Sequence, residues 1–167
     1  KPVLKLKIYC ETYGIIYLAN QTEFGFAKNN NLNFNYYQEN LKPQPTDFYL
    51  VLNPDVVISV SMINLLKEKL KQINKPCIMT ANLFLDVEFF AQDDNIRLYP
   101  SFLDFIKTFL FNNRKTIIDH NFDLPEKRDY WCSGAFLLVN QEVYKELGGF
   151  NERFFLYCED IDFCYRA

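Results

Sequence analysis

The chain has 167 residues, of which 49% are hydrophobic and 23% are charged. This length and composition predict one globular domain, covering residues 1–167, with a sizeable buried core. The net charge of −3 and the isoelectric point near 5.2 argue against nucleic acid as the main partner, because binding phosphates requires a basic face.

No signal-peptide pattern opens the chain, and no apolar run approaches the roughly 20 residues of a membrane-spanning helix. The five cysteines are odd in number and lack the CxxC spacing of a zinc site, so neither a disulfide framework nor a zinc site is indicated. These features predict a cytoplasmic location, which includes the inner face of the plasma membrane.

The first half of the chain predicts strands and helices in alternation. A buried strand is expected at 15–19, followed by a turn that enters a helix after Phe24. Two prolines place a loop at 42–46. A strand at 47–52 and an amphipathic helix at 59–74, with a serine at its start, come next.

The second half continues the alternation. Expected elements are a strand at 77–85, an irregular stretch at 86–99, a helix at 102–111 and a loop at 112–129. A strand at 131–139, a short helix at 141–147 that ends at two glycines, and a last helix from Glu159 complete the chain. The whole pattern predicts an α/β fold with a mostly parallel central sheet flanked by helices.

A carboxylate follows the strand at 47–52, in the sequence Asn53-Pro54-Asp55. Ligands of α/β sheets bind beyond the carboxyl ends of strands. A carboxylate there can hold Mg²⁺ or Mn²⁺ against a diphosphate, because hard cations prefer oxygen ligands. The same tripeptide also makes an ordinary turn, so both interpretations stand.

The last helix starts with two adjacent acids, Glu159 and Asp160. Apolar residues dominate the preceding stretch, so at least one carboxylate is expected to border an apolar pocket, where desolvation raises the pKa toward that of a general base. The alternative is that acids in a first turn merely offset the helix dipole. Asp162 and Arg166, four residues apart, can pair on the helix surface.

Two further segments combine glycine with polar or aromatic side chains. The run 131–135 joins a tryptophan that can stack on a sugar to a glycine that permits close ligand approach. A core tryptophan beside a strand bulge is the alternative. The run 25–30 enters a helix, where glycine and amides can cradle phosphate or form a plain turn.

In this order, the segments resemble those of the inverting family-2 glycosyltransferases, especially the rhamnosyltransferase-like branch. The matching segments are Gly25 to Asn31, Leu52 to Val56, Ser133 to Val139 and Gly148 to Arg166. The resemblance implies a GT-A-type nucleotide-diphosphosugar transferase fold. It also implies transfer of rhamnose or another hexose to a saccharide or lipid-linked acceptor in bacterial surface-polysaccharide synthesis.

Carried over residue by residue, the resemblance implies that Asp160 is the general base, with Glu159 beside it in the catalytic pair. Asp55 would bind Mg²⁺ or Mn²⁺, while Asn53 stands where many relatives have a second aspartate. The residues that contact the dTDP- or UDP-sugar donor would be Asn53, Asp55, Gly25 and Asn30.

The resemblance also implies an acceptor and sugar pocket. Its residues would be Trp131, Ser133, Gly134, Ala135 and Arg166. Arg166 has an alternative role, which is to brace Asp162. Relatives carry an N-terminal nucleotide-binding strand and helix, and a C-terminal end, that are not visible here. The chain is therefore expected to be a partial domain that binds donor poorly by itself.

Two other functions remain open at this point. One is a non-catalytic carbohydrate-binding or scaffold domain derived from such enzymes. The other is a peripheral membrane contact through the apolar helix expected at 102–111, for which burial or a dimer face is the alternative.

Overall fold

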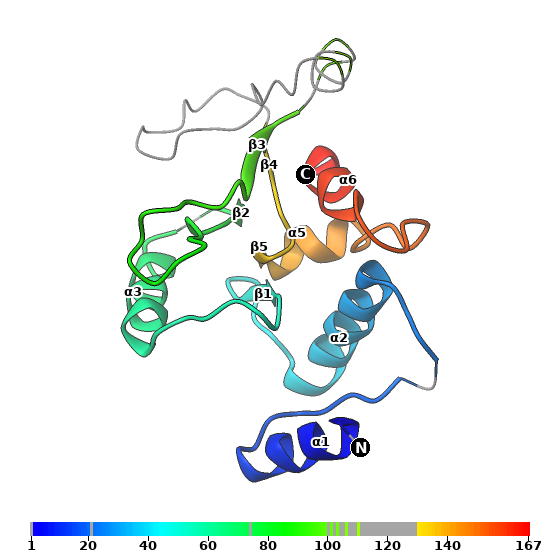
Figure 1. Ribbon diagram of the computed structural model, residues 1–167. Helices are drawn as coiled ribbons and strands as arrows, with labels where there is room; N and C mark the ends of the chain where they lie inside the picture. The colour runs from blue at the N-terminus through cyan, green and yellow to red at the C-terminus, as the bar shows by residue number, and fades with distance from the viewer. Residues whose placement is uncertain are drawn as a thin grey trace.

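The computed structural model describes residues 2–20, 22–73, 75–99, 101, 103, 106, 110 and 130–167 (Figure 1). The described helices are α1 (Pro2–Thr12), α2 (Phe26–Leu41), α3 (Val60–Leu70), α5 (Gln141–Glu146) and α6 (Glu159–Arg166). The described strands are β1 (Phe48–Leu52), β2 (Ile78–Met79), β3 (Ile96–Leu98), β4 (Tyr130–Cys132) and β5 (Phe136–Asn140).

The central sheet has the order β1-β5-β2, and β5 runs antiparallel to both of its neighbours. The prediction of a mostly parallel sheet is therefore wrong for the described strands. Because β1 and β2 both oppose β5, they point the same way, as the helical connection through α3 requires. The strand β5 lies between β1 and β2 although it comes much later in the sequence. The alternation of helices and strands in the sequence does not reveal this position.

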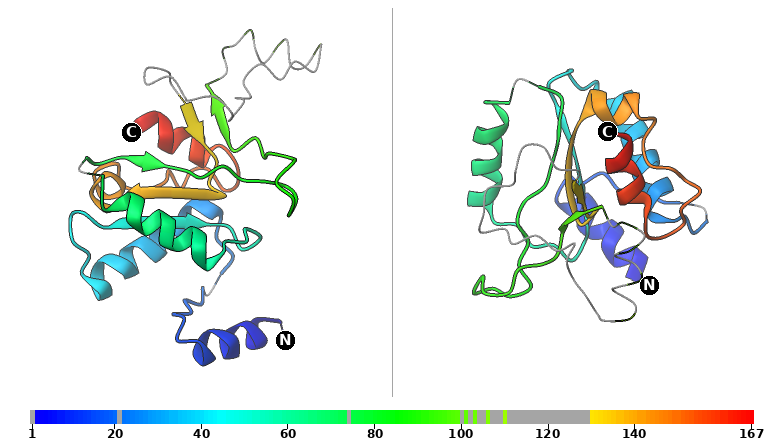
Figure 2. Two further views of the ribbon diagram at one scale, coloured as in Figure 1. Left: turned by 90° about the vertical axis from the view of Figure 1, so that its left-hand side faces the viewer. Right: turned by 90° about the horizontal axis from the view of Figure 1, so that it is seen from above.

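Helices cover both faces of the sheet (Figure 2). Helices α2, α5 and α6 lie on one side, and α3 lies on the other. The main core lies under the three helices, where apolar side chains of α2, β1, β5, α5 and α6 meet. All five residues of β5 are buried, whereas α3 buries none of its residues. The well-packed face of the sheet is thus the one that carries α6.

Local signals explain where several helices begin and end. The hydroxyl oxygen of Ser59 accepts a hydrogen bond from the Met62 amide, which caps α3 as predicted. Asn140 caps α5 in the same way through Glu142 N. Gly148 and Gly149 follow α5 with φ of 70° and 75°, a left-handed conformation that glycine adopts readily.

Three expected elements differ from the structure. Residues 15–19 form no strand, and Ile15 and Ile16 are about half exposed, because no described strand lies beside them to pair with. The strand expected at 77–85 is only Ile78–Met79. The strand expected at 131–139 is split by a turn into β4 and β5, which belong to different sheets.

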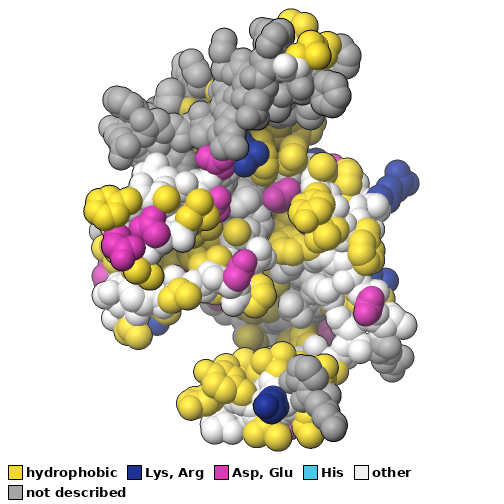
Figure 3. Space-filling model, in the orientation of Figure 1, with side chains coloured by type: hydrophobic (Ala, Val, Ile, Leu, Met, Phe, Trp, Pro, Cys, Tyr) yellow, Lys and Arg dark blue, Asp and Glu magenta, His cyan; other side chains and the backbone are white. Residues whose placement is uncertain are grey.

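Helix α1 was not predicted, and it lies apart from the sheet (Figures 1 and 3). Most of its apolar side chains are exposed, and Cys10 is its buried one among those described. The elements expected at 102–111 and 112–129 fall largely outside the described residues. Among the described residues, no helix combines the length and apolar character needed to cross a membrane.

Candidate active site at the end of β1

The end of β1 lies beside the beginning of β5, and this junction brings four predicted site residues together. Leu52 pairs with Phe136, and the Asn53 amide donates to the Ala135 carbonyl at 2.9 Å. In a parallel sheet the turn before β5 would lie at the opposite edge from Asn53. The antiparallel direction of β5 is therefore what places the 133–135 turn at the carboxyl end of β1.

Asp160 contacts this junction from α6. Its Oδ2 accepts a hydrogen bond from the Gly134 amide at 3.0 Å, and its Oδ1 accepts one from the Ile161 amide at 2.9 Å. The carboxylate is half-buried, so it retains access to solvent or a ligand. Gly134 is buried, and a Cβ at this position would lie 2.6 Å from the Phe26 ring. Glycine is thus needed for the turn to fit between α2 and α6.

Glu159, the neighbouring acid, is in a different environment. Its side chain is 5% exposed, and its buried Oε2 has no hydrogen-bond partner among the described residues. Burial raises the pKa of Glu159, and the negative charge of Asp160 adds to the rise. Of the pair, Asp160 is the more exposed acid, while Glu159 lies inside the fold.

Two contacts fix α6 against the rest of the domain. The Cys164 Sγ lies 3.5 Å from the Cys132 amide and 3.7 Å from its carbonyl oxygen, which joins α6 to β4. Arg166 donates to the Leu147 and Gly149 carbonyls at 2.7 and 2.9 Å and to Asp162 at 2.8 Å. The predicted brace between Arg166 and Asp162 is confirmed. The other role expected for Arg166, in an acceptor pocket, stays a prediction.

The segment before α6 packs on the start of α2. The Phe26 amide donates to the Phe155 carbonyl at 3.2 Å, and a Cβ at Gly25 would lie within 2 Å of that oxygen. Gly25 therefore permits a close approach of two backbones. Tyr157 and Cys158, which follow, have φ of 70° and 68°, an uncommon conformation for residues with a side chain. Donor contact by Gly25 stays a prediction.

The asparagines of α2 divide into different roles. Asn30, the predicted donor contact, donates to the Phe26 carbonyl of its own helix at 3.0 Å. Asn31 had no predicted role of its own, but its Oδ1 accepts from Tyr144 Oη and the Phe150 amide, both at 2.9 Å. Its Nδ2 donates to the Phe150 carbonyl and Glu152. Asparagine is unfavourable inside a helix, so the run of three asparagines in α2 is the sequence signal that could have identified Asn31 as important.

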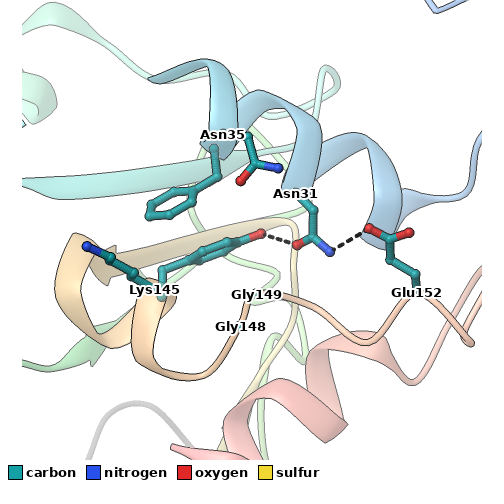
Figure 4. Close-up of a pocket in the computed structure, with 8 residues that line it drawn as sticks. Asn31, Asn35, Lys145, Gly148, Gly149 and Glu152 are labelled. Atoms are coloured by element: carbon teal, nitrogen blue, oxygen red, sulfur yellow. Dashed lines mark hydrogen bonds between the residues drawn. The ribbon is translucent and has the colours of Figure 1, made fainter. Parts of the chain in front are cut away.

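Asn31 also lines a pocket of about 230 Å³ between α2 and the glycines after α5 (Figure 4). The other lining residues are Phe34, Asn35, Tyr144, Lys145, Gly148, Gly149 and Glu152. None of the predicted catalytic, donor or acceptor residues lines it. The pocket is therefore separate from the junction that holds Asp160.

Asp55 lies in the exposed turn that follows β1, where the Val56 amide donates to the Asn53 carbonyl. Within the described residues its carboxylate has no hydrogen-bond or ion-pair partner, and no group of three or more histidine, cysteine, aspartate or glutamate side chains forms a metal cage. One open carboxylate fits a cation that takes its remaining ligands from substrate phosphates and water, which is a common arrangement for Mg²⁺.

Trp131 and Ser133 flank the same junction on the β4 side. The Trp131 ring is partly buried, and its Nε1 has no acceptor among the described residues. The Ser133 hydroxyl is also buried without a partner, while its amide donates to the Asn95 carbonyl at 2.9 Å. Buried polar atoms without partners are rare, so these two are candidates to bind a ligand or water. On the side of the molecule drawn in Figure 3, acidic and apolar side chains are interspersed.

Several known proteins that are similar to this chain in sequence are named as sugar transferases. The chain is 33% identical over 167 residues to rhamnosyltransferase WbbL of Escherichia coli K12, covering 99% of this chain and 62% of WbbL. It is 50% identical over 32 residues to the N-acetylglucosaminyl-diphospho-decaprenol L-rhamnosyltransferase of Mycobacterium tuberculosis H37Rv, covering 19% of this chain and 10% of that protein. It is 44% identical over 34 residues to the low-salt glycan biosynthesis hexosyltransferase Agl10 of Haloferax volcanii, covering 20% and 11%.

These similarities support a glycosyltransferase family for the chain. The chain spans 62% of the length of WbbL, so it corresponds to a part of that relative. No protein-family model matches it. No solved structure matches it significantly.

Proposed function

We propose that this chain carries the acceptor-activating part of an inverting, GT-A-type glycosyltransferase. The enzyme moves rhamnose or another hexose from a dTDP- or UDP-sugar to a saccharide or lipid-linked acceptor in polysaccharide synthesis. The similarity to WbbL along almost the whole chain supports a sugar transferase. The observation that carries the proposal is the hydrogen bond from the Gly134 amide to Asp160, because it holds one acid of the pair at the junction of β1 and β5.

In this mechanism Asp160 accepts the proton of the acceptor hydroxyl. The hydroxyl oxygen attacks the anomeric carbon, and the bond from that carbon to the nucleoside diphosphate breaks on the opposite face. A single in-line displacement inverts the configuration. The Gly134 and Ile161 amides each hold one carboxylate oxygen, so the group is fixed in orientation and the acceptor hydroxyl would approach a remaining lone pair of it. Such positioning is a major part of enzymatic rate enhancement.

Asp55 is the residue that we assign to a divalent cation, Mg²⁺ or Mn²⁺, with Asn53 beside it. When bound, the cation neutralises the charge that develops on the departing diphosphate. The open position of Asp55 supports this assignment, since its carboxylate is not used by the described residues of the fold. We assign the border of the acceptor and sugar pocket to Trp131, Ser133, Gly134 and Ala135, and Ala135 is bonded to Asn53.

Transfer of labelled sugar tests the proposal. The protein in its natural length is incubated with a dTDP- or UDP-sugar, Mg²⁺ and a polyprenyl-diphospho-N-acetylglucosamine acceptor, with the 167-residue chain in parallel. We expect labelled product from the protein in its natural length, with inverted anomeric configuration by NMR. A protein that binds saccharide but neither transfers nor hydrolyses any donor is instead a non-catalytic carbohydrate-binding domain, and the proposal fails.

A further inference from the structure

One face of the β3–β4 ribbon gathers polar side chains, and three of their buried atoms have no hydrogen-bond partner among the described residues. Arg97 lies opposite Trp131 in the antiparallel pairing of β3 and β4. The hydrogen bond from the Ser133 amide to the Asn95 carbonyl extends the same pairing by two residues. Because side chains alternate along strands and directly opposed residues share a face, Asn95, Arg97, Trp131 and Ser133 lie on one face. The alternate residues, Ile96 and Cys132, face the other way, and Cys132 contacts α6 through Cys164.

Arg97 supplies a positive charge to this face. Its guanidinium carbon lies 5.8 Å from the centre of the Trp131 ring. The Nε atom donates to the Asp94 carbonyl at 2.9 Å, and Nη2 lies 3.5 Å from the Asp94 carboxylate, at the outer limit of a hydrogen bond. About 39% of the Arg97 side chain is exposed. The outer edge of the guanidinium is therefore open to a ligand.

The neighbouring atoms without partners have a consistent chemistry. Trp131 Nε1 can only donate a hydrogen bond, and the Ser133 hydroxyl can donate one. Asn95 is 1% exposed; its Nδ2 is bound to Thr80 and Ala81, and its Oδ1 has no partner in the described part of the chain. Two unused donors beside a guanidinium fork favour a ligand rich in acceptor oxygens, and a buried amide oxygen next to them favours one that also carries hydroxyls.

We infer that the Asn95, Arg97, Trp131 and Ser133 face binds a phosphorylated sugar, with the phosphate on Arg97. This inference rests on the proposed function, in which the ligand is the sugar diphosphate of a lipid-linked acceptor. The donor diphosphate is assigned instead to Asp55 and its cation. Arg97 is thus a binding residue for the acceptor.

Substitution of Asp94 is expected to change phosphate affinity in the opposite direction to substitution of Arg97. Its carboxylate lies beside the Arg97 guanidinium and repels an incoming phosphate. Replacing Asp94 by asparagine removes that repulsion and leaves the guanidinium in place. Phosphate affinity then increases, whereas loss of Arg97 decreases it.

The chain contains one tryptophan, so its fluorescence reports on this face directly. The protein is titrated, without divalent cation, with inorganic diphosphate, with N-acetylglucosamine 1-phosphate and with the neutral methyl glycoside. We expect saturable changes with the two phosphates, with dissociation constants at least tenfold higher in Arg97→Gln and several-fold lower in Asp94→Asn. Arg153→Gln, an exposed arginine distant in sequence, is the control and binds like the wild type.

No saturable change in the wild type, or unchanged phosphate binding in both Arg97→Gln and Asp94→Asn, would overturn the inference. An equal loss in Arg153→Gln would also overturn it, because the effect would then be one of net charge. If Arg97→Gln does not fold by circular dichroism, the Asp94→Asn titration decides alone. The binding experiment needs no turnover, so failure of sugar transfer would remove the proposed function and leave the phosphate site standing.

Discussion

The Gly134 amide donates a hydrogen bond to Asp160 Oδ2 at 3.0 Å, and this contact joins two segments 26 residues apart. It connects the turn before β5 to the first turn of α6. The same turn is bound to Asn53 through Ala135. A backbone amide thus fixes the acid that we propose as the general base, and the end of β1 fixes that amide.

Substitution of Gly25 by alanine tests the contact between α2 and the segment before α6. The new Cβ overlaps the Phe155 carbonyl, so one backbone must move, and we expect a loss of about 1–3 kcal/mol in the free energy of unfolding. The amide of Phe26 should exchange faster by hydrogen–deuterium exchange, since its acceptor is Phe155.

Gly14→Ala is the matched control for Gly25→Ala. Gly14 has φ of 66° with no atom within 4 Å of the added Cβ, so alanine there meets only backbone strain of about 1 kcal/mol. Exchange at Phe26 should not change. Unaltered exchange at Phe26 in Gly25→Ala would count against the close packing of the two backbones.

Asn31→Ala removes the amide that links α2 to the turn after α5. Tyr144 Oη and the Phe150 amide lose their shared acceptor, so we expect a loss of about 2–4 kcal/mol in urea denaturation. Asn35, one turn along the same helix, is exposed. Its change to alanine should alter stability by less than about 0.5 kcal/mol. Equal effects of the two substitutions would contradict a structural role for the hydrogen bonds of Asn31.

The order of the motifs and the family resemblance predicted that Asn53, Gly134, Ala135 and Asp160 lie near one another, and hydrogen bonds join Asn53 to Ala135 and Gly134 to Asp160. The order and the resemblance were not sufficient to predict how these residues meet, because the direction of β5 depends on pairing between strands that are distant in the sequence. Asn31 was missed for the same reason, since its bond to Phe150 spans 119 residues. Local signals performed better: the serine at the start of α3 and the glycines after α5 act through neighbouring backbone atoms, and both were predicted correctly.

Glu159→Gln should change how stability depends on pH. Burial holds the pKa of Glu159 above its ordinary value of 4.5. An acid whose pKa rises on folding stabilises the fold fully below the unfolded-state pKa, and this contribution is lost as the pH rises through the folded-state pKa. We therefore expect the stability of Glu159→Gln relative to wild type to increase above about pH 4.5 and then level off.

Urea denaturation at several pH values from about 4 to about 8 measures this difference. Glu146→Gln, an exposed acid at the end of α5, provides the control and should show no such trend. A relative stability of Glu159→Gln that stays constant with pH would mean that the carboxyl is not perturbed by burial.

Asp55→Ala should lower the affinity for the nucleotide-sugar donor only when the divalent cation is present. If Asp55 holds the cation against the diphosphate, calorimetry on the protein in its natural length should show at least a tenfold loss of nucleotide-sugar affinity with Mg²⁺. Little change is expected with a chelator. Glu68→Ala, an exposed acid on α3, should behave like the wild type. Cation-dependent affinity that survives Asp55→Ala would exclude this residue as the ligand.

The most direct test of the account is the turnover of Asp160→Asn. Asparagine keeps an oxygen that can accept from the Gly134 amide, but it cannot take a proton from the acceptor hydroxyl. We predict that kcat for sugar transfer falls by about 10²–10⁴-fold, while donor affinity and the melting temperature stay close to those of the wild type. Transfer within a few-fold of the wild-type rate, in a variant that folds and binds donor normally, would contradict the assignment of Asp160 as the general base.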